Sequence, residues 1–239
     1  MGPRQTTTAS RLDDISTEWE VVRDPPRFVL RYAPAIQGYV RVLIKNRHDA
    51  EEVAQDFSLR VSQQCFAHTR KEGGRFRDYL KAAVRNAALS FLNRHRASKP
   101  LHSRSPQIPA GAERVWLAEW RRCLLDRAYQ ALKNHQDQSS GNLFHTVLTL
   151  VVENPREDTN TLAARTSRLI GRPLRAEAFR KQVSRARCML AKLLFDEVAR
   201  TLDNPTPQQI EEELRELALW EYVRRYLAVE PSTPGDNPN

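Results

Sequence analysis

The sequence is poor in glycine and cysteine and contains no long apolar run. It has only 8 glycines in 239 residues, too few for the many tight turns of a β-sandwich or barrel. Its three cysteines, Cys65, Cys123 and Cys188, lie far apart without a CxxC pair, which argues against a zinc site or a disulfide framework. No apolar stretch reaches the length of a membrane span, and the polar start lacks the apolar core of a signal peptide. We therefore expect a soluble, cytoplasmic protein that does not engage a membrane.

Nucleotide and metal fingerprints are absent from the sequence as well. It contains no GxGxxG, no GxxxxGK[ST] and no HExxH, and its six histidines show no ligand spacing. Glu52 and Asp56 share one helix face, but a metal-dependent nuclease needs a third acid that the sequence does not imply. Solvated acids, or acids that contact a basic partner, are the better interpretation of this pair. We predict a protein that is not an enzyme, with no catalytic residue, no cofactor and no metal.

Charge is distributed unevenly along the chain. The 38 Lys and Arg residues outnumber the 29 Asp and Glu residues, which gives a net charge of +9. Residues 70–104 carry ten basic and two acidic residues, and residues 172–192 carry seven basic residues and one acidic residue. Residues 203–239 instead carry eight acids and three bases. Two separate basic segments predict two contacts with a polyanion, whereas a solvated helix face is the alternative for either segment alone.

Apolar residues recur at three- and four-residue steps along most of the chain, and no segment alternates as a strand does. The first stripe begins at Phe28 and ends at Leu43, and Pro34 within it predicts a kink or a restart. Further stripes cover residues 50–61, 76–92, 115–132, 144–152, 162–170, 179–198 and 210–217. The sequence therefore predicts an all-α fold.

Proline and serine mark a boundary near the middle of the chain. Residues 97–112 contain three prolines and three serines and show no helical pattern, which is typical of an exposed linker. We predict two helical domains joined by this flexible linker. The divisions are an N-terminal extension (1–26), a helical bundle (27–97), the linker (98–113), a helix-turn-helix domain (114–202), and an acidic C-terminal helix with a disordered tail (203–239).

The second domain contains the pattern of a helix-turn-helix. A short helix, TLAARTSRLI (161–170), is followed by a turn with Gly171 and Pro173 and then by the basic helix AEAFRKQVSRARCMLAKLL (176–194). With Phe179, Val183 and Ala186 facing inward, the outward front of the second helix consists of Glu177, Arg180, Lys181 and Ser184. These side chains could reach base edges, while Arg185 and Arg187 could hold phosphates. An ordinary helical hairpin with a solvated face is the alternative.

The first basic segment interleaves aromatic residues with arginines. In GGRFRDYLKAAVRNAALSFLNRHR (73–96), Phe76 and Tyr79 lie close to Arg75, Arg77 and Arg85. Rings placed beside cations in this way could stack on unpaired bases while the cations hold the strand. The alternative is that these rings belong to the core. We assign Phe91 to the core and leave Phe76 and Tyr79 open, with Phe76 the preferred stacking residue.

The runs NRHDAEEVAQDFSLRV (46–61) and FRDYLKAAVRNAALSFLNRHR (76–96) resemble the second conserved region of bacterial extracytoplasmic-function (ECF) sigma factors. Members of that family carry an acidic stretch that ends in F-L-R-V and then FR-x-W-L-x-x-x-ARN with a basic helix end. Residues 162–194 resemble the fourth region, whose recognition helix ends in RAR-x-x-L. The resemblance covers roughly residues 27–227 and is strongest to the planctomycete-type group. It implies a sigma factor that binds core RNA polymerase and promoter DNA and starts transcription.

The resemblance also implies roles for individual residues. The residues that it implies bind polymerase are Asp49, Glu52, Gln55, Asp56, Leu59 and Arg60. Binding of the −10 promoter element falls on Arg75, Phe76, Arg77, Tyr79, Arg85 and Asn86, beside the loop from Ala67 to Arg77 that would capture a flipped base. Binding of the −35 element falls on Arg175, Glu177, Arg180, Lys181, Ser184, Arg185 and Arg187. An anti-sigma factor is a further partner that the resemblance allows.

The chain departs from the family pattern at two places. Tyr79 stands where the family usually has tryptophan, and GRPLR (171–175) lengthens the turn before the recognition helix.

Two other function classes stay open. A conventional helix-turn-helix regulator would bind duplex DNA without polymerase, and a nucleic-acid-modifying enzyme would need a catalytic cluster that the sequence does not contain.

Overall fold

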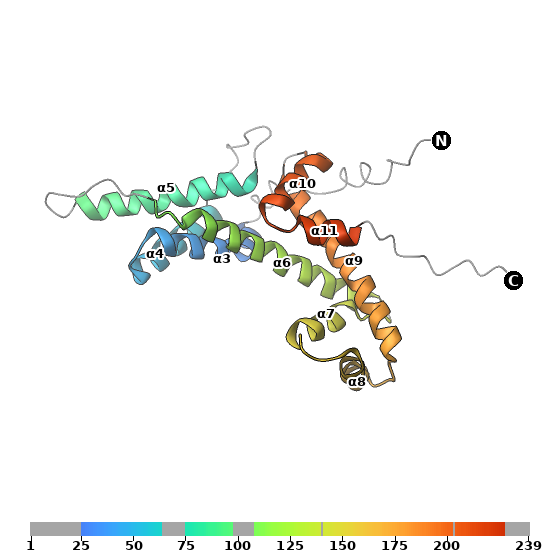
Figure 1. Cartoon of the computed structure of the whole chain (residues 1–239). Coiled ribbons are helices and arrows are strands. Elements are labelled where there is room, and N and C mark those ends of the chain that lie inside the picture. Colours follow the sequence, from blue (N-terminus) through green and yellow to red (C-terminus); the bar gives the residue numbers. More distant parts are fainter. Residues whose placement is uncertain (1–24, 64–74, 98–107, 140, 203, 228–239) are drawn as a thin grey trace, which may run out of the picture. The chain divides into compact units, whose positions relative to one another are not determined.

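The computed structural model describes residues 25–63, 75–97, 108–139, 141–202 and 204–227 (Figure 1). Within these ranges the chain forms nine α-helices and no strand, which confirms the predicted all-α fold. The chain divides into two compact units, the first made of Met1–Leu124 and Val198–Glu213 and the second of Leu125–Glu197 and Leu214–Asn239. None of the described helices qualifies as a membrane span.

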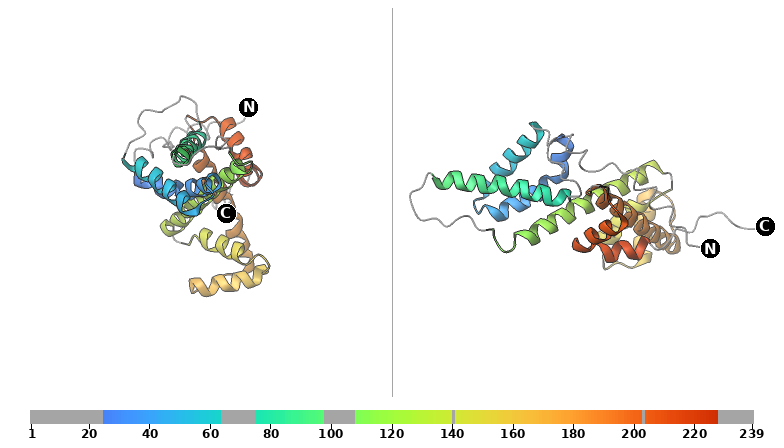
Figure 2. Two further views of the ribbon diagram at one scale, coloured as in Figure 1. Left: turned by 90° about the vertical axis from the view of Figure 1, so that its left-hand side faces the viewer. Right: turned by 90° about the horizontal axis from the view of Figure 1, so that it is seen from above.

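The first unit is built on three neighbouring helices, α3 (Pro25–Leu43), α4 (Arg47–Gln63) and α5 (Phe76–Ala97). These helices lie side by side in all three views (Figures 1 and 2). Each buries the apolar stripe that its period of 3.6 residues places on one face. The buried residues include Ile36 and Val40 on α3, Ala50, Val53, Ala54, Phe57 and Val61 on α4, and Leu80, Val84 and Phe91 on α5. Phe91 is thus a core residue, as predicted.

Two local features concern the course of α3 and the start of α4. Pro34 lies inside α3, so the helix passes through the proline and does not restart there. Asn46 precedes α4, and its side-chain Oδ1 accepts from the backbone N–H groups of His48 and Asp49 at 2.9 and 3.3 Å. This cap satisfies two of the N–H groups that the first turn of a helix leaves without an intrahelical acceptor.

An aromatic core joins the beginning of α6 (Ala112–Gln138) to the three-helix bundle. Trp116 and Trp120 are fully buried, as the predicted stripe of this helix requires. The Trp120 ring stacks on Tyr32 at a centroid distance of 4.9 Å, and Trp116 meets Tyr39 edge to face at 5.2 Å. Phe76, at the start of α5, is also fully buried and lies 5.3 Å from Tyr32.

The chain returns to the first unit at residues 198–213, which we call the return segment. It contains the end of α9 (Ala176–Arg200) and most of α10 (Pro207–Glu216). α10 begins with a capping box, because Thr206 Oγ1 accepts from the Gln209 N–H at 3.3 Å and Gln209 Oε1 accepts from the Thr206 N–H at 2.8 Å. Pro207 occupies the first helical position, where its missing N–H costs nothing.

The second unit contains the rest of α6 and α9 together with α7 (Phe144–Glu153), α8 (Thr159–Ile170) and α11 (Trp220–Leu227). Its buried side chains come from every one of these helices, and they include Leu132, Val147, Leu162, Phe179, Leu190, Leu194 and Val223. A buried ion pair joins α6 to α9, with Arg127 Nη2 at 2.5 Å from Glu197 Oε2.

Several element bounds differ from the sequence-based expectation. α6 begins at Ala112, three residues before the predicted resumption of helix at Val115. The predicted acidic helix over residues 210–217 corresponds to α10, and the structure adds a second helix, α11, after it. Ala218, with a left-handed φ of 54°, lies between the two helices. Three predicted parts lie wholly or largely outside the described residues: residues 1–24 of the N-terminal extension (1–26), residues 98–107 of the linker (98–113), and all of the disordered tail (231–239). The two compact units divide within α6, after Leu124.

Candidate functional site

α4 presents an exposed, mainly acidic face opposite its buried stripe. Of the residues assigned to polymerase binding, the exposed ones are Glu52, Gln55, Leu59 and Arg60, and the half-buried ones are Asp49 and Asp56. The side chain of Leu59 is 54% exposed, which places an apolar contact between the charged groups. This combination of carboxylates around an exposed leucine suits a partner with basic and apolar groups on one surface.

The carboxylates of α4 differ in how they are paired. Glu51 accepts from Arg47 Nε at 2.9 Å and lies 3.6 Å from Arg41 Nη2. The hydrogen bond from Arg47 and the nearby cations hold the pKa of Glu51 below its usual range. Asp56 forms an ion pair with Arg60 one turn later. Among the described residues Glu52 has no ion pair, so its charge is available to a partner.

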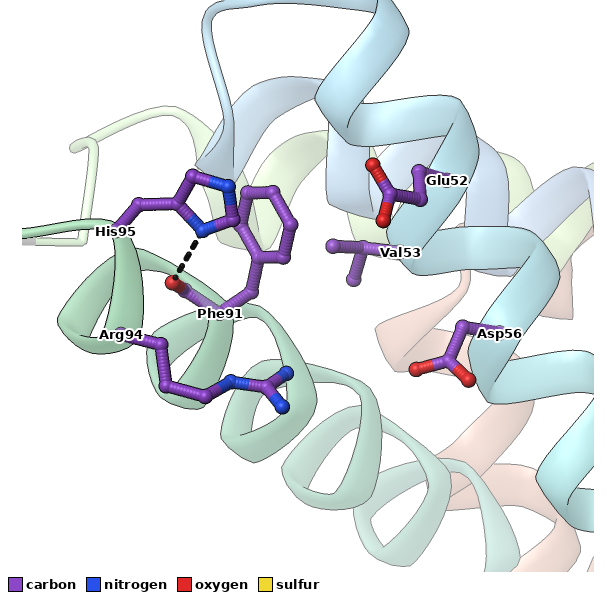
Figure 3. Close-up of a pocket in the computed structure, with 6 residues that line it drawn as sticks. All are labelled: Glu52, Val53, Asp56, Phe91, Arg94 and His95. Atoms are coloured by element: carbon purple, nitrogen blue, oxygen red, sulfur yellow. Dashed lines mark hydrogen bonds between the residues drawn. The ribbon is translucent and has the colours of Figure 1, made fainter.

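Glu52 and Asp56 reach a pocket of about 430 Å³ between α4 and α5 (Figure 3). Figure 3 shows the two carboxylates on α4, with Arg94 and His95 on α5 across the pocket. The His95 ring stacks on Phe91 at a centroid distance of 3.9 Å, and its Nδ1 lies 3.2 Å from the Phe91 carbonyl oxygen. The acidic face of α4 is therefore bordered by a basic helix end.

The side chains in and just before the first turn of α5 differ in how deeply they are buried. Phe76 is fully buried against Tyr32 and Trp120, and Arg77 is only 1% exposed. Both Arg75 and Arg77 form ion pairs with Glu213, which is itself fully buried. Tyr79 is half-buried. The Phe76 ring, the preferred stacking residue, is therefore covered in this structure, and a base can reach it only after its cover has moved.

The middle of α5 carries the exposed members of the group assigned to −10 DNA, Arg85 and Asn86. Lys81 lies one turn earlier, where its Nζ donates to Glu113 Oε1 at 2.8 Å and lies 3.4 Å from Asp78 Oδ1. Burial lowers the pKa of Lys81, but Glu113 and Asp78 together outweigh that effect and raise it above the usual value. The residues from Ala67 to Gly74 of the predicted capture loop lie outside the described residues.

In the second unit, α8 is followed by a turn and then by α9, over the residues for which a helix-turn-helix is predicted (Figure 1). Asp158 caps α8 by accepting from the N–H groups of Asn160 and Thr161 at 2.7 and 3.1 Å. These bonds, the one from Thr161 above all, lower the pKa of Asp158. Gly171 ends the helix with a φ of 69°, and Ser167 Oγ accepts from the Leu174 N–H at 2.8 Å within the turn.

The front of α9 has the predicted division into buried and exposed sides. Phe179, Val183 and Ala186 are buried. The exposed residues are Arg175, Glu177, Arg180, Lys181, Ser184 and Arg185. Lys181 Nζ lies 2.7 Å from Glu177 Oε1, and its bond to this carboxyl lowers the pKa of Glu177. Four cations thus stand on one exposed surface that begins in the turn and continues along the helix, the arrangement that a DNA backbone favours.

Arg187 differs from the other residues assigned to −35 DNA because α11 covers part of it. Its guanidinium carbon lies 6.0 Å from the centroid of the Tyr226 ring, and its carbonyl oxygen accepts from the Tyr222 hydroxyl at 3.5 Å. Burial raises the pKa of Tyr222 well above its usual value. Arg187 is accordingly half-buried.

No role was predicted for Glu213, the buried partner of Arg75 and Arg77. A signal was present, because Glu213 lies three residues after Ile210 and directly before Leu214, on the apolar side of its helix. A carboxylate in such a position needs a buried cationic partner. The identity of that partner depends on a contact between residues more than a hundred positions apart, which periodicity does not reveal.

Among the described residues, no three His, Cys, Asp or Glu side chains gather closely enough to hold a metal ion. The comparisons with known proteins give one positive finding. Residues 28–98 match the family model of Sigma-70 region 2, and this range coincides with the bundle of α3, α4 and α5. No curated protein and no solved structure matches the chain. The bundle is thus similar to Sigma-70 region 2, the region through which sigma factors bind core RNA polymerase.

Proposed function

We propose that the protein is a promoter-specificity subunit of RNA polymerase, a sigma factor of the ECF type from the planctomycete-type group. The observation that carries this proposal is the agreement between the Sigma-70 region 2 match and the three-helix bundle. The exposed acidic face of α4 lies within the matched residues, where a polymerase-binding surface is expected. A sigma factor acts in the cytoplasm on DNA and polymerase, and it catalyses no reaction of its own.

In this proposal the exposed surfaces of α4, α5 and α9 each bind a different partner. The face of α4 around Glu52 and Leu59 binds core polymerase. Tyr79, Arg85 and Asn86 on α5 contact the unpaired −10 strand, and the exposed front of α9 contacts duplex −35 DNA. The basic character of the last two surfaces supports these assignments, because contacts with phosphates supply much of the affinity for DNA.

The decisive experiment is transcription with purified core polymerase on a library of random duplex DNA, followed by sequencing of the transcript starts. A sigma factor yields transcripts whose upstream DNA shares two short elements at a fixed spacing. Core polymerase alone provides the background. If the full chain neither binds core polymerase nor changes the distribution of starts, the proposal is wrong.

A conventional helix-turn-helix regulator is the second candidate, and the α8–turn–α9 layout favours it independently of the bundle. Such a protein would bind one duplex sequence tightly without polymerase. It would also leave core polymerase unbound in a pull-down, whereas a sigma factor is retained on it.

A further inference from the structure

The return segment covers the first turn of α5, which holds three of the residues assigned to −10 DNA. We infer that the return segment competes with DNA for this turn, so that an unpaired strand must displace it before Arg77 can take part in binding. This inference rests on the proposed function and adds a regulatory contact within the chain itself. In this inference the acidic C-terminal part of the sequence blocks a basic surface of the same chain from binding DNA.

The main chain provides the first link between the two elements. Arg75 and Leu202 form an antiparallel β-bridge, and the Phe76 N–H donates to the Thr201 carbonyl oxygen at 3.2 Å. The first N–H groups of a helix have no acceptor within the helix. The return segment therefore occupies a helix end at which backbone donors would otherwise be available to a phosphate.

The ion pairs provide the second link. One carboxylate oxygen of Glu213, Oε2, lies 3.3 Å from Arg75 Nη1 and 3.3 Å from Arg77 Nη2. Glu213 is fully buried and Arg77 is 1% exposed, whereas Arg75 keeps a third of its side chain in solvent. Because a carboxylate between two guanidiniums resembles a phosphate in charge and in bonding, Glu213 occupies the position that a DNA phosphate would take.

Stability alone does not explain why charges are used here. Taking both partners of an ion pair out of water costs about as much as their attraction returns, and an apolar pair of the same volume is often at least as stable. Removal of the carboxylate, on the other hand, takes one anionic partner away from Arg75 and Arg77, and a phosphate can replace that partner. The two arginines can therefore exchange Glu213 of the same chain for a phosphate of bound DNA.

The test compares two full-length variants with the same change in net charge. Glu213→Gln removes the buried carboxylate, and Glu212→Gln removes its exposed neighbour. Binding of a fluorescent single-stranded DNA of mixed sequence is followed by anisotropy at fixed salt. If the segment is closed about nine times in ten, its release tightens binding roughly tenfold in Glu213→Gln, and Glu212→Gln binds like wild type.

A second pair of variants tests the segment without changing any charge. Ile210 is fully buried in the return segment, and Gln208 is exposed on the same helix. Ile210→Ala loosens the packing of the segment and should also tighten single-strand binding, whereas Gln208→Ala should not. This pair decides the question if Glu213→Gln does not fold. The wild-type chain provides a further measurement, because DNA that displaces the segment must speed hydrogen exchange at the amides of residues 208–213.

The outcomes separate this inference from the proposed function. Tighter binding by Glu213→Gln and Ile210→Ala, together with faster exchange in wild type, supports the competition. If these variants bind single strands as wild type does while the wild-type chain still directs transcription with core polymerase, the competition is overturned and the sigma-factor proposal stands. If the wild-type chain neither binds core polymerase nor redirects transcript starts, the proposed function fails and the inference falls with it.

Discussion

The ring of Tyr32 on α3 lies parallel to the ring of Trp120 on α6, with centroids 4.9 Å apart and planes inclined by 6°. Both residues are fully buried, and Phe76 of α5 lies against both of them. The stack ties a residue beyond the Sigma-70 region 2 match to the core of the matched bundle. The beginning of α6 is thus part of the folding unit that carries the candidate polymerase-binding face.

The first prediction follows from this stack. Trp120→Ala removes a large buried ring and should lower the free energy of unfolding by about 3–5 kcal/mol, because the cavity cannot close fully. Arg114→Ala, at an exposed position of the same helix, should change it by less than about 0.5 kcal/mol. Urea titrations of the full chain measure both values. Equal stability of the two variants would show that the stack contributes nothing to the first unit.

The second prediction concerns the face of α4. Glu52→Lys combined with Asp56→Lys should weaken core-polymerase binding strongly, because the cations of the partner would then meet like charge. Glu51→Lys combined with Glu153→Lys carries the same change in net charge at exposed sites outside the proposed face. Titration of labelled core polymerase measures both double variants. Equal weakening by both would indicate a general charge effect and not a contact at this face.

These predictions depend on features that the sequence alone revealed to different degrees. The buried stripe of α4 and the buried side of α9 were predictable, because each amphipathic helix has one apolar face and the period of 3.6 residues identifies it. The exposure of Leu169, at 66%, was not, since the residue continues the apolar pattern of α8 and the structure leaves it uncovered.

Contacts between distant segments limited the prediction of the site. Phe76 follows Gly73-Gly74 and neighbours two arginines, a local pattern that equally fits an exposed stacking ring. Its burial depends on Tyr32 and Trp120, which come from other helices, and neither partner is identifiable from periodicity. The same limitation applies to Glu213, whose partners on α5 precede it by more than a hundred residues.

The third prediction concerns the exposed front of α9. Arg180→Ala should cost about 1–3 kcal/mol in binding duplex promoter DNA, and the loss should be confined to one base pair if Arg180 bonds guanine in two places. Arg156→Ala, at an exposed position in the turn before α8, is the matched control. Binding to a set of single-base variants of the duplex measures the selectivity. A uniform loss with a shallower salt dependence would identify a phosphate contact instead.

The fourth prediction concerns pH and the cap of α8. The bonds from Thr161 and Asn160 lower the pKa of Asp158 in the folded chain, so its contribution to stability is present above the unfolded pKa of about 3.9. That contribution is lost as the pH falls through the lower folded pKa. Asp158→Ala should therefore reduce the melting temperature at neutral pH, and its difference from wild type should become smaller in acid. Asp158→Asn keeps a capping oxygen without the charge, so its melting temperature at neutral pH should lie between those of Asp158→Ala and wild type.

The last prediction separates a core ring from a DNA-binding ring at the start of α5. Phe76 is fully buried whereas Tyr79, 6.4 Å away between ring centroids, is half-buried, so the two alanine variants should fail in different assays. Phe76→Ala should lower the melting temperature of the chain through the cavity it leaves. Tyr79→Ala should cost roughly 1–3 kcal/mol in single-strand binding, because a ring that stacks on a base is lost. Tyr79→Phe keeps the ring and should bind like wild type, and duplex −35 binding should be unchanged in all three variants because that surface belongs to the second unit. Unchanged single-strand affinity in Tyr79→Ala, measured well below its melting temperature, would assign Tyr79 to the core together with Phe76.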